Sequence, residues 1–238
     1  MDYNVKKFKE GLKAFNITLS DKQIEQFLTY YEFLVETNKV MNLTAITDFD
    51  EVIEKHFLDS LSLCQIYDLS KECSILDLGT GAGFPGIPLK IAFPEIKLVL
   101  ADSLNKRIKF LQEVIERLGL EKVETVHARA EELARNSQYR EQFDLCVSRA
   151  VANLSSLSEY CIPFVKVGGK FISYKSGEIE EEVNQAKKAI SVLGGKIVDV
   201  YKFDLYEQKR SFVVIEKKKK TPGTYPRKAG TPTKQPLV

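Results

Sequence analysis

The first 70 residues show apolar side chains at helical spacing. Between residues 21 and 40 an apolar side chain recurs every three or four positions, and Ser20 stands where such a helix is capped. The same periodicity returns from Val52 to Tyr67. The pattern predicts two helices, Asp21–Val40 and Val52–Tyr67, joined by a short segment, and so a helical N-terminal extension.

From Cys73 onward, short apolar runs alternate with helical patterns. Repeated strand–helix–strand units predict an α/β fold with a seven-stranded, mostly parallel sheet covered by helices on both faces. No helical pattern separates the last two runs, which are expected to pair as an antiparallel hairpin. Paired glycines at 168–169 and 194–195 indicate connections between elements. The expected strands are Ser74–Leu78, Lys97–Ala101, Val123–His127, Phe143–Ser148, Lys170–Tyr174, Lys196–Phe203 and Ser211–Glu216, and the expected helices are Ile87–Phe93, Leu104–Leu118, Glu131–Asn136, Leu154–Val165 and Ile179–Leu193.

The C-terminal segment differs from the rest of the chain in composition and charge. Its prolines and glycines predict an extended arm without regular structure. From Lys217 onward there are seven basic and no acidic residues, whereas residues 1–216 carry 28 basic and 33 acidic ones. This asymmetry indicates a polyanionic partner, with a purely solubilising tail as the alternative. A further interpretation has the Tyr225–Pro232 part pack back on the body and complete the wall of the active site. We therefore expect three parts: a helical extension over 1–70, an α/β domain over 71–217 and a basic arm over 218–238.

The overall composition excludes several classes of protein. The hydrophobic fraction is 44% and the charged fraction 29%, which is typical of soluble globular proteins. No apolar run approaches the roughly 20 residues of a membrane span, and the N-terminus lacks the apolar core of a signal peptide. The four cysteines and two histidines are scattered without metal-ligand spacing. We expect a cytoplasmic monomer with reduced, buried cysteines, no membrane partner and no metal.

The strongest chemical signal is the segment Leu76–Gly86, where a strand runs into a glycine-rich turn that precedes a helix. Glycines permit the tight turn and allow the backbone to approach a nucleotide closely. Asp77 stands two residues before Gly79, where it would repel a pyrophosphate and attract a sulfonium or ammonium group. Asp102, at the end of the second strand, is placed to bind ribose hydroxyls. These residues favour S-adenosylmethionine over a dinucleotide as the cofactor.

Two further strand ends face the same crevice. The backbone of Ala130 and Glu131, after the third strand, can read an adenine edge. Arg149, at the end of the fourth strand, can pair with the cofactor carboxylate or with a substrate phosphate. Phe84 either closes the cofactor pocket or packs beneath the first helix of the sheet, and the sequence leaves both interpretations open.

The absence of several known motifs reduces the number of possible methyl-acceptor atoms. Amino-group methylation usually shows an Asn/Asp-Pro-Pro-aromatic motif after the fourth strand, and this chain has Ser148–Ala150 there. Cys161 lies within a helical pattern, which argues against its being a nucleophile for cytosine methylation, and Lys175 alone does not make the lysine-rich set typical of ribose methylation. Guanine N7 has a free lone pair and needs no general base, so positioning suffices. A site without an evident base fits this acceptor.

These residues also carry a family resemblance. Nearly end to end, the chain resembles the bacterial small-subunit ribosomal RNA guanine-N7 methyltransferases, the glucose-inhibited division protein B family. The resemblance implies a Rossmann-like class I methyltransferase fold and N7-methylation of one guanine in the decoding-site loop of 16S ribosomal RNA. It also implies cofactor contacts at Gly79, Phe84, Asp102, Ala130, Glu131 and Arg149. The motifs that carry it are Asn42–Ile46, His56–Ser60, Asp77–Gly86, Asp102–Arg107, Arg129–Glu131, Ser148–Val151 and Tyr225–Pro232.

The resulting expectations concern a cofactor, an RNA and the arm. The partner is 16S ribosomal RNA or a small-subunit precursor, and Arg149 also positions the reacting groups. The alternatives are a methyltransferase-fold RNA-binding factor and a small-molecule methyltransferase. Because every cofactor motif precedes Ala150, removal of the arm is expected to leave cofactor binding nearly intact. The candidate cofactor-binding residues are Asp77, Gly79, Gly81, Phe84, Asp102, Ser103, Leu104, Ala130, Glu131 and Arg149, and the candidate RNA-binding residues are Lys106, Arg107, Arg129, Lys175, Tyr225, Arg227, Lys228 and Lys234.

Overall fold

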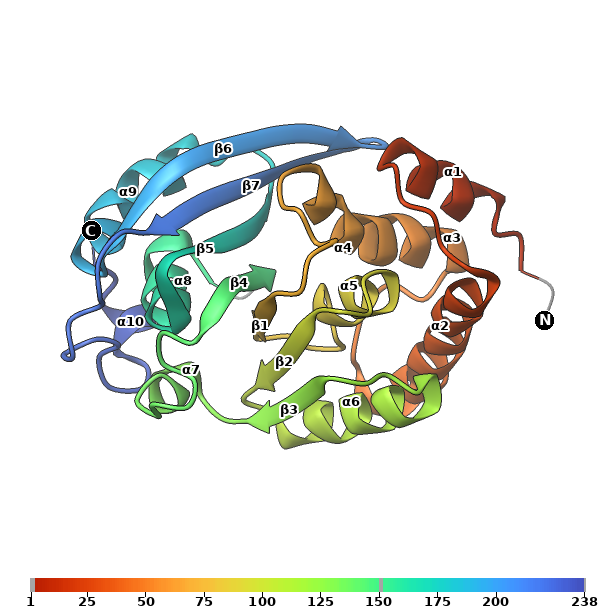
Figure 1. Ribbon diagram of the computed structural model, residues 1–238, viewed down its shortest axis with the longest axis horizontal. Coiled ribbons are helices and arrows are strands. Elements are labelled where there is room, and N and C mark those ends of the chain that lie inside the picture. The colour runs from red at the N-terminus through yellow and green to blue at the C-terminus, as the bar shows by residue number, and fades with distance from the viewer. Residues whose placement is uncertain (1–2, 150–151, 238) are drawn as a thin grey trace.

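The computed structural model describes residues 3–149 and 152–237 and is built on one seven-stranded sheet (Figure 1). The strand order is β3-β2-β1-β4-β5-β7-β6. Strands β1 to β5 are parallel to one another, and β7 is antiparallel to both β5 and β6. The expected mostly parallel sheet and its terminal hairpin are confirmed. The strands are β1 (Ser74–Leu78), β2 (Lys97–Asp102), β3 (Val123–His127), β4 (Phe143–Arg149), β5 (Val165–Ser176), β6 (Gly195–Leu205) and β7 (Gln208–Lys217).

Helices cover both faces of the sheet, and this explains why the central strands are continuously apolar. Neighbouring residues on β1 point to opposite sides: Ile75 joins one apolar cluster and Leu76 the other. The first cluster includes α2, α5 and α6, and the second includes α8 and α9. The helical elements are α1 (Lys6–Ala14), α2 (Asp21–Met41), α3 (Phe49–Val52), the π-helix η1 (Ile53–Leu58), α4 (Asp59–Leu61), the 3₁₀ helix η2 (Ser62–Gln65), α5 (Gly86–Ala92), α6 (Asn105–Leu118), α7 (Ala130–Leu133), α8 (Leu154–Cys161), the 3₁₀ helix η3 (Ile162–Phe164), α9 (Glu180–Val192) and α10 (Thr231–Lys234).

The N-terminal extension packs onto the sheet domain. Helix α2 begins as predicted after Ser20, whose hydroxyl accepts from the Gln23 backbone while the Gln23 side chain accepts from the Ser20 backbone. It packs against α5 and α6. Phe8 and Phe57 of the extension lie in the same apolar cluster as Leu100 of β2. The extension and the sheet therefore share a hydrophobic core.

The predicted helix Val52–Tyr67 is wrong as a single element. The structure divides this stretch among α3, η1, α4 and η2. A π-helical turn contains more residues than an α-helical turn, so it rotates the residues after it relative to those before it. The turn occupies Ile53–Leu58, and Asp59 follows it directly, buried with only 3% of its surface exposed. Periodicity alone predicts a regular helix here and misses this rotation.

The paired glycines 168–169 lie within a strand, which corrects their prediction as a connection. Strand β5 begins at Val165, so the predicted helix Leu154–Val165 ends earlier, through η3. Phe143 pairs with Val165 and Leu145 with Lys170, so β5 bulges between these two pairs and its glycines fall in the bulge.

The C-terminal segment is not an extended arm, and that prediction is wrong. It contains α10 and lies along the body of the molecule beside α8 (Figure 1). The Thr221 hydroxyl donates to the Leu193 carbonyl at 2.7 Å, and Ser156 Oγ donates to the Pro232 carbonyl at 2.7 Å. Lys217, the first of the seven basic residues, is buried and donates to two carbonyls of η3 and β5. Burial lowers its pKa to about 8, although nearby Glu141 acts in the opposite direction.

Candidate functional site

A cavity of about 390 Å³ opens at the carboxyl ends of β1, β2 and β3. We call it the Asp102 cavity. Ligands of open parallel sheets bind at this edge, outside the carboxyl ends of the strands. The structure brings five of the expected cofactor residues together here: Gly79, Asp102, Ser103, Ala130 and Glu131. The complete lining is Leu78, Gly79, Ala101, Asp102, Ser103, Arg107, Ala128, Arg129, Ala130, Glu131, Tyr160, Gly230 and Thr233.

The Asp102 carboxylate is held rigidly at the tip of β2. Its Oδ1 accepts from the Leu104 backbone at 2.9 Å, and its Oδ2 accepts from the Gly81 backbone at 3.0 Å and from Arg107 at 3.2 Å. Only 3% of the residue is exposed. Gly81 and Leu104, expected to touch the cofactor, are therefore placed where their backbone amides orient Asp102, and neither lines the cavity.

Asp77 is buried near the end of β1, beside the glycine turn, and it does not line the Asp102 cavity. Its Oδ2 accepts from the Thr80 hydroxyl at 2.7 Å and from the Gly86 backbone at 2.8 Å, so this oxygen closes the turn. Among the described residues, Oδ1 has no hydrogen-bond partner. Burial raises the pKa of this carboxyl to about 6, although the two hydrogen bonds act in the opposite direction. Sequence reasoning placed Asp77 inside the turn, whereas it is the penultimate residue of β1.

Two glycines of the turn are needed for packing. Gly83 has φ +104, and a Cβ there would lie 2.8 Å from Tyr30 Oη and 2.7 Å from Ile87. A Cβ on Gly86 would lie 2.8 Å from Asp77 Oδ2. Glycine is required at both places because the chain passes so close to its own buried groups. The motif thus serves the internal structure of the turn as well as the approach of a ligand.

Phe84 packs inside an aromatic group between the turn and the N-terminal extension. Its ring stacks on His56 with centroids 4.5 Å apart and lies 5.4 Å from the ring of Tyr30. It is 5% exposed and does not line the Asp102 cavity. Of the two interpretations of this residue, the geometry favours packing.

The C-terminal segment packs back on the body and forms part of the Asp102 cavity, which is the second of the two interpretations that the sequence left open for Tyr225–Pro232. Gly230 and Thr233 line the cavity, and the Gly230 backbone donates to Glu131 Oε1 at 2.8 Å. Thr233 and Tyr160 share a hydrogen bond of 2.7 Å between their hydroxyl oxygens. The tail motif Tyr225–Pro232 was the available signal, and its charges and prolines also suggested RNA contact.

A second cavity, of about 680 Å³, lies at the ends of β4 and β5 and the beginning of β7. We call it the Arg149 cavity. Arg149 Nη1 donates to Asp59 Oδ2 at 2.7 Å, and Arg210 Nε donates to Asp59 Oδ1 at 2.7 Å. Arg149 also lies 5.2 Å from the Phe84 ring, so it stands between the glycine turn and this cavity. The lining is Ile46, Lys55, His56, Asp59, Arg149, Tyr174, Lys175, Ser176, Glu182, Gln208 and Arg210.

His56 completes the support of Arg149. Its Nδ1 lies 3.2 Å from Arg149 Nη2, and its Nε2 lies 2.9 Å from Thr44 Oγ1. Nδ1 also lies 3.0 Å from the Lys55 carbonyl oxygen, so it accepts from Arg149 when it carries no hydrogen and donates to Lys55 when it carries one. Burial and then the Arg149 charge lower the pKa of this imidazole from 6.5 to about 4. Asp59 and His56 belong to one of the family motifs, whereas nothing in the sequence singled out Arg210.

The predicted RNA-binding residues are distributed over several environments. Arg107 and Arg129 line the Asp102 cavity, and Lys175 is paired with Glu182 inside the Arg149 cavity. Arg227 is an expected RNA-binding residue, but in the structure its guanidinium forms hydrogen bonds to the fully buried carboxylate of Glu159. An RNA phosphate would have to compete with Glu159 for this side chain. The remaining candidates stand as follows: Lys106 donates to the Met41 carbonyl, Tyr225 is half-buried, and Lys228 and Lys234 are exposed.

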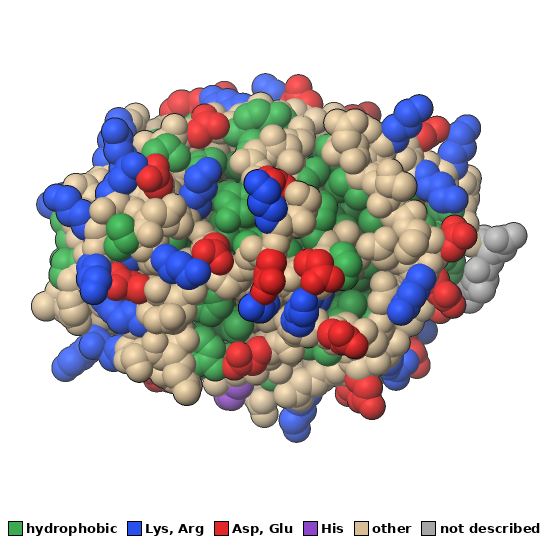
Figure 2. Space-filling view, in the orientation of Figure 1, with side chains coloured by type: hydrophobic (Ala, Val, Ile, Leu, Met, Phe, Trp, Pro, Cys, Tyr) green, Lys and Arg blue, Asp and Glu red, His purple; other side chains and the backbone are tan. Residues whose placement is uncertain are grey.

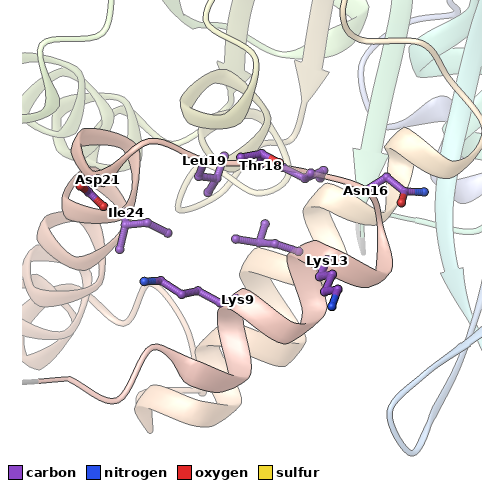
Figure 3. Close-up of a pocket in the computed structure, with 9 residues that line it drawn as sticks. Lys9, Lys13, Asn16, Thr18, Leu19, Asp21 and Ile24 are labelled. Carbon is purple, nitrogen blue, oxygen red and sulfur yellow. The ribbon is translucent and has the colours of Figure 1, made fainter.

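A third pocket and a cluster of basic side chains lie elsewhere on the described surface. Figure 3 shows a pocket between α1 and α2, lined by Lys9, Lys13 and Asp21 among others, which contains no residue of the strand ends. In the view of Figure 2, Lys and Arg side chains gather at the left end, where Figure 1 shows α9, α10 and the C-terminal segment. Ala150 and Val151, part of another family motif, lie outside the described residues.

Neither a metal-ligand cluster nor a membrane-spanning helix is found among the described residues. There, no three His, Cys, Asp or Glu side chains are grouped so as to hold a metal ion. No helix within residues 3–149 and 152–237 has the length and apolar character that crossing a bilayer demands. All four cysteines are free, and Cys146 and Cys161 are buried, which agrees with the prediction that Cys161 belongs to the core.

Solved structures of low sequence identity share this fold. The structure of M. jannaschii TYW2 in complex with AdoMet superposes with a TM-score of 0.56 at 15% identity, over 73% of this chain and 79% of that one. The ribosomal protein L11 methylase of Lactobacillus delbrueckii subsp. bulgaricus gives a TM-score of 0.52 at 16% identity, over 69% of this chain and 79% of that one. The strand order and the cavity at the strand ends define a class I methyltransferase, the fold of adenosylmethionine-dependent enzymes.

Sequence comparisons identify the family within that class. The family described as GidB, rRNA small subunit methyltransferase G, matches residues 23–213, and the chain belongs to this family. Ribosomal RNA small subunit methyltransferase G of Lachnoclostridium phytofermentans is 52% identical over 233 residues, covering 97% of this chain and 96% of that protein. The protein of the same name from Acetivibrio thermocellus is 55% identical over 231 residues, covering 96% and 95%. The protein is thus an rRNA methyltransferase.

Proposed function

We propose that the protein transfers a methyl group from S-adenosylmethionine to N7 of a guanine in the decoding-site loop of 16S ribosomal RNA. The observation that carries this proposal is the pair of cavities at the same edge of the sheet, one at the ends of β1, β2 and β3 and the other at the ends of β4 and β5. One is suited to a nucleoside and presents Asp102, and the other is lined by cationic side chains around Arg149. The family to which the chain belongs supports ribosomal RNA as the substrate. We place the reaction in the cytoplasm, with a single chain as the active unit.

The residues of the Asp102 cavity fit S-adenosylmethionine. A buried carboxylate such as Asp102 suits the two ribose hydroxyls, because charged hydrogen bonds of this kind are strong. Asp102 accepts a hydrogen bond from Arg107 at 3.2 Å, and a bound ribose would replace this contact. The backbone of Ala130 and the Glu131 side chain lie where the adenine is expected. The volume of about 390 Å³ lies within the range of small-molecule sites.

The chemistry that the cofactor supplies is an electrophilic methyl group on a sulfonium. An acceptor such as guanine N7 would take this methyl group on its free lone pair, so the protein would not need to remove a proton from the base. The protein's part is to hold the base in line and to stabilise charge. Arg149, fixed by Asp59 and His56, positions an anion beside the reacting atoms.

The titratable groups beside the Arg149 cavity agree with an acceptor that needs no base. Asp59 accepts from two arginines, and both ring nitrogens of His56 are engaged by Arg149 and Thr44. A general base must be able to reach the proton that it removes. Among the described residues of this wall, neither of these groups is free to do so. For Asp59 and His56, this arrangement agrees with guanine N7 as the acceptor, because N7 loses no proton.

The deciding experiment is a methyl-transfer assay on 16S ribosomal RNA that lacks this mark. Labelled methyl from S-adenosylmethionine is expected to appear in one loop guanine, and digestion with mass spectrometry should give 7-methylguanosine. Transfer only to small molecules would establish the small-molecule alternative. Tight RNA binding without transfer would establish an RNA-binding factor instead. The assay is run on naked RNA and on assembling subunits, which also identifies the preferred form of the substrate.

Asp102 provides the test of the cofactor assignment. Asp102→Ala is expected to weaken S-adenosylmethionine binding about 10- to 150-fold, the loss that corresponds to about 1.5–3 kcal/mol for charged hydrogen bonds. Calorimetric titration measures this directly. Asp68→Ala, which removes an exposed acid that pairs only with Lys71 and Ser70, is the control and should bind normally. Unchanged affinity in Asp102→Ala would remove this residue from the cofactor site.

A further inference from the structure

The Arg149 cavity has a charge pattern suited to a nucleotide. Four cationic side chains line it, against two carboxylates and the neutral His56, so its formal charge is +2. Arg149 and Arg210 share Asp59, and Lys55 pairs with Glu51, which does not line the cavity. An excess of positive charge in a cleft attracts a phosphate-bearing ligand. The remaining pair, Lys175 and Glu182, lies on the side of the cavity far from β1.

Lys175 and Glu182 present a donor beside an acceptor. Lys175 Nζ donates to Glu182 Oε1 at 2.6 Å and to the Ala152 carbonyl at 3.0 Å. Glu182 Oε1 also accepts from the Leu154 backbone at 2.6 Å. Among the described residues, no hydrogen bond engages Glu182 Oε2. The side chain of Lys175 is 13% exposed and that of Glu182 is 29% exposed, so both are held in place while still facing the cavity.

We propose that this pair reads the Watson–Crick edge of the acceptor guanine, with Lys175 donating to O6 and Glu182 accepting from the N1 and N2 hydrogens. The proposal rests on the proposed function and assigns its specificity for the base. Guanine offers an acceptor followed by donors along this edge, whereas adenine offers a donor followed by an acceptor. The donor of Lys175 and the acceptor of Glu182 therefore match guanine. Against adenine they would face a donor and an acceptor of the same kind, so the pair selects guanine and excludes adenine.

The position of the pair also turns the reactive atom in the required direction. Lys175 stands at the end of β5, and the sheet order places β4 between β5 and β1. N7 lies on the side of guanine opposite to its 2-amino group. A base whose amino edge is held by Glu182 therefore directs N7 across Arg149 of β4 toward the Asp102 cavity. Methylation makes the ring cationic and its N1 hydrogen more acidic, so the bond to Glu182 strengthens as the reaction proceeds.

A purely structural role of the pair makes different predictions. Glu182 holds the first backbone amide of α8, and Lys175 holds the Ala152 carbonyl, so both anchor the end of the loop that follows β4. Glu182→Gln separates the two roles. The amide oxygen can still accept from Leu154, whereas the NH₂ group replaces an acceptor by a donor facing the base. Glu181→Gln is the matched control, because Glu181 is exposed on the same helix and, among the described residues, its hydrogen bond is to Gln185.

The test compares two RNAs with two proteins. The RNA is the loop fragment of the proposed function, carrying either guanine or inosine, which lacks the 2-amino group, at the target position. With the wild-type chain, inosine is expected to lower kcat/KM by about 10- to 150-fold, the loss of a charge-assisted hydrogen bond. Glu182→Gln should lower kcat/KM on guanine by a similar factor and on inosine, which keeps its N1 hydrogen, by a smaller factor. Such non-additivity is the mark of a direct contact.

The possible outcomes test the base-reading role and the proposed function separately. Equal wild-type rates on guanine and inosine, or losses that simply multiply in Glu182→Gln, would overturn the base-reading role. Absence of wild-type transfer to N7 of guanine would instead overturn the proposed function. RNA affinity measured with S-adenosylhomocysteine should follow the same pattern as kcat/KM. Cofactor affinity should stay within about twofold in Glu182→Gln and Glu181→Gln, because neither residue lines the Asp102 cavity.

Discussion

A single buried carboxylate, Asp59, joins the N-terminal extension to two strands of the sheet. It accepts from Arg149 of β4 and from Arg210 of β7, both at 2.7 Å. Removing one partner of such a buried group leaves charge without compensation, which typically costs about 3–5 kcal/mol. The arginine that we place beside the reacting atoms is therefore also part of the structural framework. Substitutions at Arg149 must be judged by stability as well as by turnover.

His56 should make the fold sensitive to acid. Its folded pKa of about 4 lies below the ordinary value of 6.5, so the unfolded chain takes up a proton first as the pH falls. The stability that it contributes is complete above pH 6.5 and is lost as the pH falls toward 4. The difference corresponds to about 3 kcal/mol. Urea unfolding at pH 7 and pH 4.5 measures the loss.

The variant His56→Gln should lose less stability over this interval, by about 2–3 kcal/mol. Glutamine can donate to Thr44 and accept from Arg149, so both neighbours keep partners. The control is His127→Gln, which changes an exposed ring and should follow the wild-type acid dependence. An identical acid loss in wild type and His56→Gln would contradict the assignment.

Among the elements, regular patterns were predictable and irregular ones were not. The strands β1 to β4 and the helix α2 could be predicted because apolar periodicity and a capping box suffice for them. The π-helical turn η1 could not, since an extra residue in a turn leaves the apolar pattern almost unchanged. Much of the Asp102 cavity lining was predictable because it follows strand ends, while Gly230 and Thr233 arrive from the far end of the chain.

The C-terminal segment should contribute to cofactor binding, which reverses the expectation from the sequence. Deleting residues 218–238 removes Gly230 and Thr233 from the cavity and frees the Glu131 carboxylate. We expect cofactor affinity to fall about 10-fold or more, the effect of losing a hydrogen bond to a charged group. Calorimetric titration of the truncated chain tests this. An unchanged dissociation constant would show that the segment only borders the cavity.

The exposed lysines of the same segment test RNA binding separately. Replacing Lys219, Lys220, Lys228 and Lys234 by Gln leaves the packed backbone of the segment in place, because these side chains are exposed. Cofactor affinity should stay unchanged. The slope of log RNA affinity against log salt should shrink by about 0.7 for each phosphate of single-stranded RNA that the variant no longer neutralises. An unchanged slope would show that these lysines do not touch the RNA.

At the scale of the molecule, the extension and the sheet form one body. Phe8, Phe57 and Leu100 belong to a single apolar cluster, and Tyr30 donates to the Ala82 carbonyl of the glycine turn at 2.5 Å. A boundary near residue 70, predicted from the change of pattern, marks a change of architecture but not a break in the core. Helix α1 and the C-terminal segment lie at opposite ends of the long axis (Figure 1).

A fragment of residues 71–238 is therefore expected not to fold cooperatively. It would expose the apolar surface of β2, α5 and α6 that the extension covers. The whole chain should unfold in urea with coincident transitions by circular dichroism and by the fluorescence of its ten tyrosines. A fragment with a sharp transition of its own, or two separate transitions in the whole chain, would contradict a shared core.

The contribution of Gly230 and Thr233 to the Asp102 cavity has a consequence for synthesis of the chain. A nascent polypeptide can complete its sheet when β7 has emerged from the ribosome, yet the Asp102 cavity still lacks one wall. With the cofactor in this cavity, as proposed above, full cofactor affinity is expected only after Gly230 and Thr233 have left the exit tunnel and the segment has folded back against α8. For the same reason, a nonsense mutation just after β7 would leave every predicted cofactor motif intact and still damage the enzyme.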